Sequence, residues 1–313
     1  MRHILPQCER LSVQFGCDTV GMQVAPAAVT RWLLFLSTAG LMILARTGFV
    51  ARRFARMSSL TPFSPLGTPK PAVVHQYLDT KRVKERTIVV GDVHGCFDEL
   101  KELLVKCSYN KHNCTLIFVG DLVNKGPYSV ETIRFARKEG AYCVRGNHDD
   151  SMLAHALKFK NSCSYELPKW YEYIKDLTDE DLEWVNELPY TITIPSLNAV
   201  VVHAGLVPGI HLEEQKPGDM CYMRNLLSSD NGFVASAKGS EGSSWASMWS
   251  THDKSNVTVF FGHDAKRELQ MFDRAVGLDT GCCYGKKLTA YVLPDNQLVS
   301  VPAKKVYEEI KSK

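Results

Sequence analysis

Five short apolar runs in the sequence are each followed at once by residues that can bind a metal ion or a phosphate group. The five motifs are Gly-Asp-Val-His-Gly at 91–95, Gly-Asp-Leu-Val-Asn-Lys-Gly at 120–126, Arg-Gly-Asn-His-Asp at 145–149, His-Ala-Gly at 203–205 and Gly-His-Asp at 262–264. One such motif alone is more often a turn or a packed histidine, but chance does not place five in series. Carboxylate, imidazole and amide ligands suit Mn, Fe, Zn or Mg rather than copper or a thiolate site. We therefore expect one metal centre.

The residues before these motifs are expected to form β-strands separated by helices. Short β-branched runs predict strands at 87–90, 116–119, 142–144, 199–202 and 257–261. Apolar residues at helical spacing predict a helix over 97–107, and Thr178 with Asp181 predicts a capping box at the start of another helix. This alternation is typical of an α/β fold, in which the carboxyl ends of the strands open onto one crevice. Residues far apart in the chain can therefore meet there.

Charged residues and cysteines limit the other classes of function. About +6 of charge lies between Thr19 and Leu78, a stretch without Asp or Glu, so the rest of a chain with a net charge of +3 carries about −3. Net charge therefore does not indicate a nucleic-acid-binding surface on the folded part. The 10 cysteines include no Cys-x-x-Cys pair, which favours buried free thiols over a zinc ribbon. Reduced thiols favour a domain that faces the cytosol or an organelle matrix.

The composition of the chain changes near residue 72. Residues 60–71 are rich in proline and predict a stiff, extended linker. Residues 228–244 are rich in serine and glycine and predict a loop within the folded part. We therefore divide the chain into an N-terminal targeting or membrane-anchor segment with its linker, residues 1–71, and a folded domain, residues 72–313.

The apolar run from Trp32 to Ala45 has 14 residues, fewer than the roughly 20 that span a bilayer. The run is long enough only if it continues past Arg46 to Ala51, which would give a membrane contact through residues 32–51. A mitochondrial presequence and a signal sequence that starts at Met22 are the other interpretations, and a disordered tail is the plain alternative. The expected localisation is cytoplasmic-facing or mitochondrial, with membrane anchoring in the first of these interpretations.

The five motifs resemble those of calcineurin-like metallophosphoesterases related to serine/threonine protein phosphatases, over roughly residues 85 to 295. Longer segments are similar to the symmetrical diadenosine tetraphosphatases and their eukaryotic ApaH-like phosphatase relatives. These segments are GDVHGCFDEL at 91–100, GDLVNKGP at 120–127, HAGLVPG at 203–209 and GLDTGCCYGKKLTA at 277–290. The resemblance implies an α/β fold, a metallophosphoesterase sandwich of two mixed β-sheets flanked by helices.

The resemblance also implies a site for two divalent metal ions, Mn, Zn, Fe or Mg. The ligands carried over by motif position are Asp92 and His94 for the first ion, Asp121 as the bridge, and Asn147, His203 and His263 for the second. Two such ions lower the pKa of a bridging water, so that a hydroxide attacks phosphorus without a covalent enzyme intermediate. His148 would donate a proton to the leaving oxygen.

One pair of residues departs from the protein phosphatases, which carry Asp-Arg where this chain has Asn124-Lys125. An amide cannot stabilise an imidazolium as a carboxylate does, and lysine is a point charge rather than a bidentate clamp. Lys125, Arg224 and Asn147 are the candidates for phosphate binding.

The expected reaction is cleavage of a phosphoanhydride or phosphoester bond in a phosphorylated small molecule such as a dinucleoside polyphosphate, in inorganic polyphosphate, or at an RNA 5′ end. A serine/threonine phosphoprotein phosphatase is the alternative enzyme, which the Asn124-Lys125 pair disfavours. A membrane-tethered binding module without catalysis is an alternative of another class, which the complete ligand set disfavours.

Overall fold

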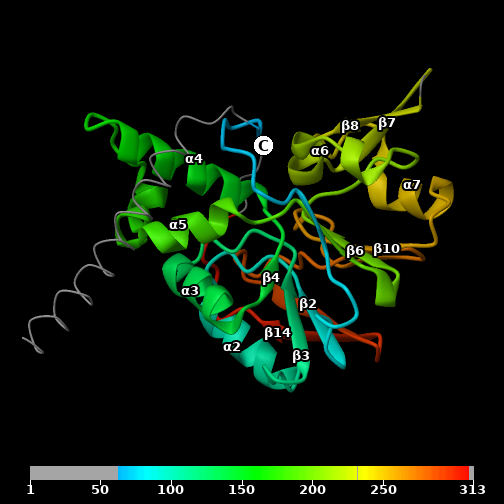
Figure 1. Ribbon diagram of the computed structural model, residues 1–313, viewed down its shortest axis with the longest axis horizontal. Helices are drawn as coiled ribbons and strands as arrows, with labels where there is room; N and C mark the ends of the chain where they lie inside the picture. The colour runs from blue at the N-terminus through cyan, green and yellow to red at the C-terminus, as the bar shows by residue number, and fades with distance from the viewer. Residues whose placement is uncertain (1–62, 231, 310–313) are drawn as a thin grey trace, which may run out of the picture. The chain divides into compact units, whose positions relative to one another are not determined.

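The computed structural model describes residues 63–230 and 232–309 (Figure 1). All five motifs lie within these ranges, whereas the expectations for residues 32–51 fall outside them. Among the described residues, no helix has both the length and the apolar character needed to cross a bilayer.

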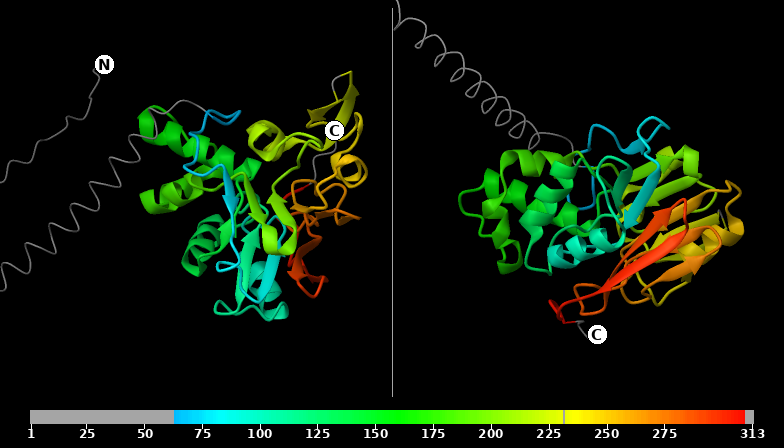
Figure 2. Two further views of the ribbon diagram at one scale, coloured as in Figure 1. Left: turned by 45° about the vertical axis from the view of Figure 1, so that its right-hand side comes forward. Right: turned by 90° about the horizontal axis from the view of Figure 1, so that it is seen from below.

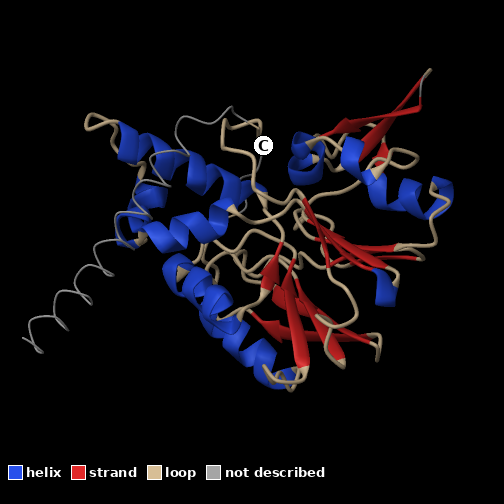
Figure 3. Ribbon diagram, in the orientation of Figure 1, coloured by secondary structure: helices blue, strands red, loops and turns tan. Residues whose placement is uncertain are grey.

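Two mixed β-sheets form the centre of the described part (Figure 3). The six-stranded sheet has the order β1 (His75–Tyr77), β5 (Thr191–Ile194), β6 (Ala199–Val202), β10 (Thr258–Phe261), β12 (Ala275–Gly277) and β11 (Gln270–Phe272). The five-stranded sheet has the order β14 (Gln297–Pro302), β13 (Lys287–Leu293), β2 (Arg86–Val90), β3 (Cys114–Phe118) and β4 (Tyr142–Cys143). The motifs follow β2, β3 and β4 in the five-stranded sheet and β6 and β10 in the six-stranded sheet. The strands β2, β3 and β4 are parallel to one another, and β6 is parallel to β10.

The two sheets pack face to face because their strands are apolar on both sides. In β2, Val89 contributes to the core between the sheets, whereas Ile88 and Val90 face the helices. In β10, Phe260 faces the other sheet and Phe261 faces outward. Alternation of this kind follows from the two-residue period of a strand. The expected sandwich of two mixed sheets flanked by helices is confirmed.

Helices cover both outer faces of this sandwich. They are α2 (Phe97–Lys106), α3 (Ser129–Glu139), α4 (Asn147–Asn161), α5 (Asp179–Asn186), α6 (Pro217–Tyr222) and α7 (Trp245–His252), with 3₁₀ turns η1 (Lys169–Asp176), η2 (Pro195–Leu197) and η3 (Leu212–Glu214). Apolar residues of α2 to α5 pack with the five-stranded sheet, and those of α6 and α7 pack with the six-stranded sheet (Figures 1 and 2). The predicted capping box of α5 is present, since Thr178 accepts from the Asp181 N–H and Asp181 accepts from the Thr178 N–H.

The prediction of a loop over residues 228–244 is wrong. This region forms most of a three-stranded antiparallel sheet with the order β8 (Gly232–Ser236), β7 (Asn225–Ser229) and β9 (Ser243–Ser244). Serine and glycine suggested a loop, but the strands include Leu226, Leu227, Phe233 and Val234, and most of their residues are exposed or partly buried.

Residues 63–71, expected to form an extended linker, instead fold back onto the domain. The Thr68 hydroxyl donates to the carboxylate of Asp150 and accepts from the guanidinium of Arg145 at 3.2 Å. The Phe63 ring packs edge-to-face on Tyr190 with the centroids 5.7 Å apart. Arg145 is completely buried and also donates to the carbonyl of Asn186, so it has a structural role here.

Candidate metal centre

The five motifs meet at one place, at the carboxyl ends of strands from both sheets. Asp92 and His94 follow β2, Asp121 follows β3, and Asn147 begins α4 just after β4. His203 follows β6 and His263 follows β10. The carboxylates and the three imidazoles named here are all buried, so the site lies in a region of low dielectric constant.

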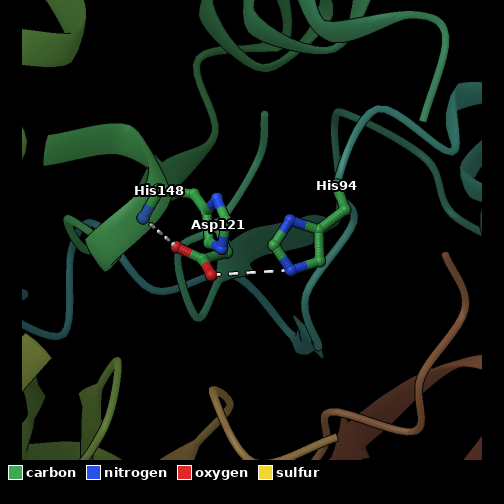
Figure 4. A group of neighbouring side chains, drawn as sticks. All are labelled: His94, Asp121 and His148. Carbon is green, nitrogen blue, oxygen red and sulfur yellow. Dashed lines mark hydrogen bonds and ion pairs between the residues drawn. The ribbon is translucent and has the colours of Figure 1, made fainter. Parts of the chain in front are cut away.

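Asp121 lies between two groups of ligand atoms. Its Oδ2 is 3.5 Å from His94 Nε2, and its Oδ1 is 3.5 Å from His203 Nε2. Figure 4 shows Asp121 directed at His94 on one side and at the backbone of His148 on the other. Within the described residues, His94, Asp121 and His148 form one cluster that could hold a cation, and Asp92, Asp121 and His203 form a second. Asp121 therefore belongs to both clusters.

The hydrogen bonds of the histidines test whether a cation fits. The Nδ1–H of His94 donates to the carbonyl of Val123 at 2.9 Å, and that of His203 donates to the carbonyl of Val119 at 2.9 Å. In a neutral imidazole, the Nε2 of each ring then carries a lone pair, and this lone pair faces Asp121. A backbone acceptor on the far ring nitrogen is also how metal-binding histidines are usually oriented.

Asn147 completes the set of facing acceptors. Its Oδ1 is 2.9 Å from Nε2 of His203 and 2.9 Å from Nδ1 of His263. His263 contacts the carbonyl of Tyr222 through its other nitrogen, at 3.2 Å, which leaves the lone pair on Nδ1. Three acceptors that converge without a proton between them match a metal cation. The residues present therefore fit the divalent ions that the sequence implies.

Electrostatics support the same conclusion. Burial raises the pKa of Asp92 well above its usual value, and the carboxylates of Asp279 and Asp121 raise it further. Burial raises the pKa of Asp121 to about 6 and lowers the pKa of His203 to about 4. Buried carboxylates need a positive charge nearby to stay ionised, which a divalent cation supplies, and a neutral imidazole keeps a lone pair for it.

Asp149 holds the loops that carry the ligands. Its buried carboxylate accepts the backbone N–H groups of Asp121 at 2.8 Å, Leu122 at 3.0 Å and Gly146 at 3.0 Å. Asp121 itself has a left-handed φ of 50°, a conformation that non-glycine residues adopt only where other contacts support it. From the sequence, Asp149 was assigned no role, although an acid in the first turn of a helix is well placed to accept the backbone N–H groups that the helix leaves unpaired.

His148 is positioned by two residues from separate elements. Asn124 donates through Nδ2 to His148 Nδ1 at 3.1 Å, and the Tyr173 hydroxyl donates to Asn124 Oδ1 at 2.6 Å. Burial lowers the pKa of His148 well below its usual value, and the charge of Lys125 adds to this shift. The sequence did not point to Tyr173, because η1 brings it to the site from 49 residues beyond Asn124.

The two predicted phosphate-binding cations lie at the edge of the centre. The ammonium of Lys125 is 2.7 Å from His94 Nε2 and sits over the ring of Tyr284, 5.1 Å from its centroid. Arg224 donates to the carbonyl of His263 at 3.4 Å. The Lys125 ammonium shows that a cation is accommodated opposite the His94 lone pair.

Comparisons with known proteins agree with this geometry. A family model described as calcineurin-like phosphoesterase matches residues 85–285. The symmetrical bis(5'-nucleosyl)-tetraphosphatase of Coxiella burnetii (strain Dugway 5J108-111) is 32% identical over 268 residues, which cover 69% of this chain and 91% of that protein. The asymmetrical bis(5'-nucleosyl)-tetraphosphatase PrpE of Oceanobacillus iheyensis is 27% identical over 241 residues, 70% of this chain and 93% of that protein.

A solved structure of a protein provisionally described as a diadenosine tetraphosphatase has the same fold. It superposes with a TM-score of 0.66 at 36% sequence identity and covers 74% of this chain and 98% of that one.

Proposed function

Since the chain belongs to the family of calcineurin-like phosphoesterases, we propose that it is a two-metal hydrolase that cleaves phosphoanhydride bonds in dinucleoside polyphosphates. This chain matches nearly the whole length of two relatives that are named as bis(5'-nucleosyl)-tetraphosphatases. Inorganic polyphosphate and capped RNA 5′ ends contain the same kind of bond and are the other candidate substrates.

The chain supplies ligands for two cations, with Mn, Zn, Fe and Mg as the candidate metals. Asp92 and His94 would hold one ion, Asn147, His203 and His263 the other, and Asp121 both. Ions bound there would supply Lewis acidity that activates water and neutralises charge on the phosphoryl group. Asp149 keeps Asp121 in place, and Lys125 and Arg224 would contact phosphate oxygens.

The partner of His148 is the observation that carries the choice of substrate. Because Asn124 donates to Nδ1, the proton of the neutral ring lies on Nε2. The phosphate of a departing nucleotide is already a stable anion, since its last ionisation lies near pH 6. It therefore needs only a hydrogen bond, which the Nε2–H of His148 can donate. A departing seryl oxygen needs a full proton, which an imidazolium supported by a carboxylate gives more readily. The Asn124 amide, in place of a carboxylate beside His148, therefore favours phosphoanhydride substrates over phosphoproteins.

The test measures product release by the full-length protein in Mn, Zn or Mg. The substrates are diadenosine tetraphosphate, inorganic polyphosphate, capped RNA and a phosphoserine peptide, and the inactive controls are His148→Ala and Asp121→Asn. We expect the dinucleotide to be cleaved, and both variants to lose at least a hundredfold in kcat. Turnover of the phosphopeptide alone would replace this proposal with the protein-phosphatase alternative, and no hydrolysis in any metal would end it.

A further inference from the structure

A cavity of about 260 Å³ lies between the loop that begins at Val207, helix α6 and strand β8. Its apolar wall includes Val207, Phe233 and Val234. The Phe233 ring is held edge-to-face against His252, with the centroids 5.2 Å apart. Pockets for complete small-molecule ligands have volumes of about 300 to 1,000 Å³. This cavity therefore has room for one ring system rather than for a whole dinucleotide.

Each wall of the cavity is connected to the metal centre by a short piece of chain. Val207 is four residues after His203, which corresponds to at most about 15 Å. Asp219, on the α6 wall, is one helical turn before Tyr222, whose carbonyl contacts His263. On the β8 wall, Ala235 lines the cavity, and the carbonyl of the next residue, Ser236, accepts the backbone N–H of Arg224 at 2.8 Å. The cavity therefore lies within about 15 Å of the centre, on the chain segments that follow His203 and precede the Tyr222 carbonyl at His263.

Two carboxylates lie among the polar residues of the cavity. Glu214 and Asp219 line it with Lys216 and Gln215, and the Gln215 amide is already paired with the backbone of Val207 and Ile210. Asp219 is half-buried, and among residues 63–230 and 232–309 no group donates a hydrogen bond to its carboxylate. Burial raises the pKa of Asp219, while the charge of Lys216 opposes this shift. A half-buried carboxylate without a donor favours a ligand that brings N–H groups.

We propose that this cavity binds one nucleobase of the substrate, and that its carboxylates select a base with an exocyclic amino group. The proposal rests on the function proposed above and adds the part of the substrate that is recognised. Phe233 offers an aromatic ring for stacking, which is how proteins commonly hold single bases. Glu214 and Asp219 accept from the amino group. Two carboxylates against one ammonium repel a phosphate chain, so the phosphates stay at the metal centre beside Lys125 and Arg224.

The test compares substrates that share the reacting bond and differ in the base. Steady-state hydrolysis of diadenosine tetraphosphate, diuridine tetraphosphate and inorganic tripolyphosphate is measured for the full-length protein, Phe233→Ala and Asp219→Asn. Uracil presents carbonyl oxygens where adenine presents an amino group. Glu213→Gln is the matched control, because Glu213 neighbours Glu214 but does not line the cavity.

We expect Phe233→Ala to raise KM for diadenosine tetraphosphate about tenfold relative to KM for tripolyphosphate, as the loss of one stacked base predicts. Asp219→Asn should remove the preference for adenine over uracil, and Glu213→Gln should behave as the wild type. An unchanged KM ratio in Phe233→Ala, or an adenine preference that survives in Asp219→Asn, overturns the proposal.

Equilibrium binding of adenosine separates this proposal from the proposed function. If the wild type hydrolyses none of the three substrates but binds adenosine, and Phe233→Ala does not, the proposed function fails and the base site stands. If the dinucleotide is hydrolysed but adenosine does not bind and neither variant has an effect, the proposed function stands and the base site fails. Thermal unfolding of each variant shows that it is folded.

Discussion

At the residue scale, backbone carbonyls fix the tautomer and orientation of two imidazoles at the metal centre, those of His94 and His203. Val119 and Val123 give their carbonyls to the far nitrogens of His203 and His94, and both valines belong to the β3 region that also delivers Asp121. The same segment therefore supplies a ligand and orients two others. His148 differs, because side chains rather than the backbone position it, through Asn124 and Tyr173.

The hydroxyl of Tyr173 is open to a direct test. Tyr173→Phe removes the donor to Asn124, which lets the amide rotate and turn its oxygen toward His148. We expect kcat to fall about tenfold, in line with the roughly 1 to 3 kcal/mol cost of a buried polar group that loses its partner. Metal content, measured by elemental analysis, should stay at the wild-type value because no ligand is touched.

Tyr171→Phe is the matched control for this change. The Tyr171 hydroxyl pairs with Ser151 and not with Asn124, so its removal should leave kcat within twofold of the wild type. Equal losses in both variants would mean that η1 is merely destabilised and that Tyr173 does not position His148.

At the element scale, the first turn of α4 and the loop after β3 act as one unit. A single carboxylate, that of Asp149, ties the start of the helix at Gly146 to the turn at Asp121 and Leu122. Three ligand-bearing positions have left-handed backbones, with φ of 48° at His94, 50° at Asp121 and 69° at His263. Conformations of this kind persist only where neighbouring contacts determine them.

Asp149→Asn tests this unit. An asparagine has one acceptor oxygen in place of two, so at least one of the three backbone N–H groups loses its partner. Hydrogen bonds to a charged group contribute about 1.5 to 3 kcal/mol, and for a domain of this size we expect the melting temperature to fall by about 5 °C. Metal affinity should fall with it, because Asp121 is no longer held.

Asp98→Asn is the control, since Asp98 is also in the first turn of a helix but pairs only with the exposed Lys101. Its melting temperature should change by less than about 2 °C. A melting temperature and a metal affinity that stay unchanged in Asp149→Asn would contradict the role given to this carboxylate.

The sequence predicted the strands at the metal centre to within a few residues, because their β-branched runs are buried on both faces. It predicted the ligands because glycine and polar residues at a strand end are a local signal. It could not predict the role of Tyr173 or the effect of the Asp279 charge on the pKa of Asp92, since these depend on how distant segments pack. The sheet of β7 and β8 was missed because its strands are mostly exposed or partly buried and do not alternate apolar with polar residues.

At the scale of the whole molecule, the two sheets meet at the metal centre, so a bound cation links them. Asp92 comes from the five-stranded sheet and accepts the backbone N–H of His263, from the six-stranded sheet, at 3.1 Å. Ions that bind only the folded state stabilise it by mass action. Metal occupancy should therefore affect global stability as well as activity.

Removal of the metal tests this coupling. We expect chelation by EDTA to lower the melting temperature by at least about 5 °C, since ligand at 100 times Kd contributes about 2.7 kcal/mol. Addition of Mn or Zn should restore it, as followed by scanning calorimetry. Asp121→Asn should show little response to EDTA, and a wild-type protein equally indifferent to EDTA would contradict the metal centre.

The contacts of Thr68 set a limit on how this protein can be processed. A peptidase that trimmed the chain past Thr68 would remove the hydroxyl that Arg145 and Asp150 share and expose a guanidinium that is now completely buried. Those two residues flank Asn147 and His148, so the damage would begin beside the ligands. An N-terminus that keeps this contact therefore lies before Thr68.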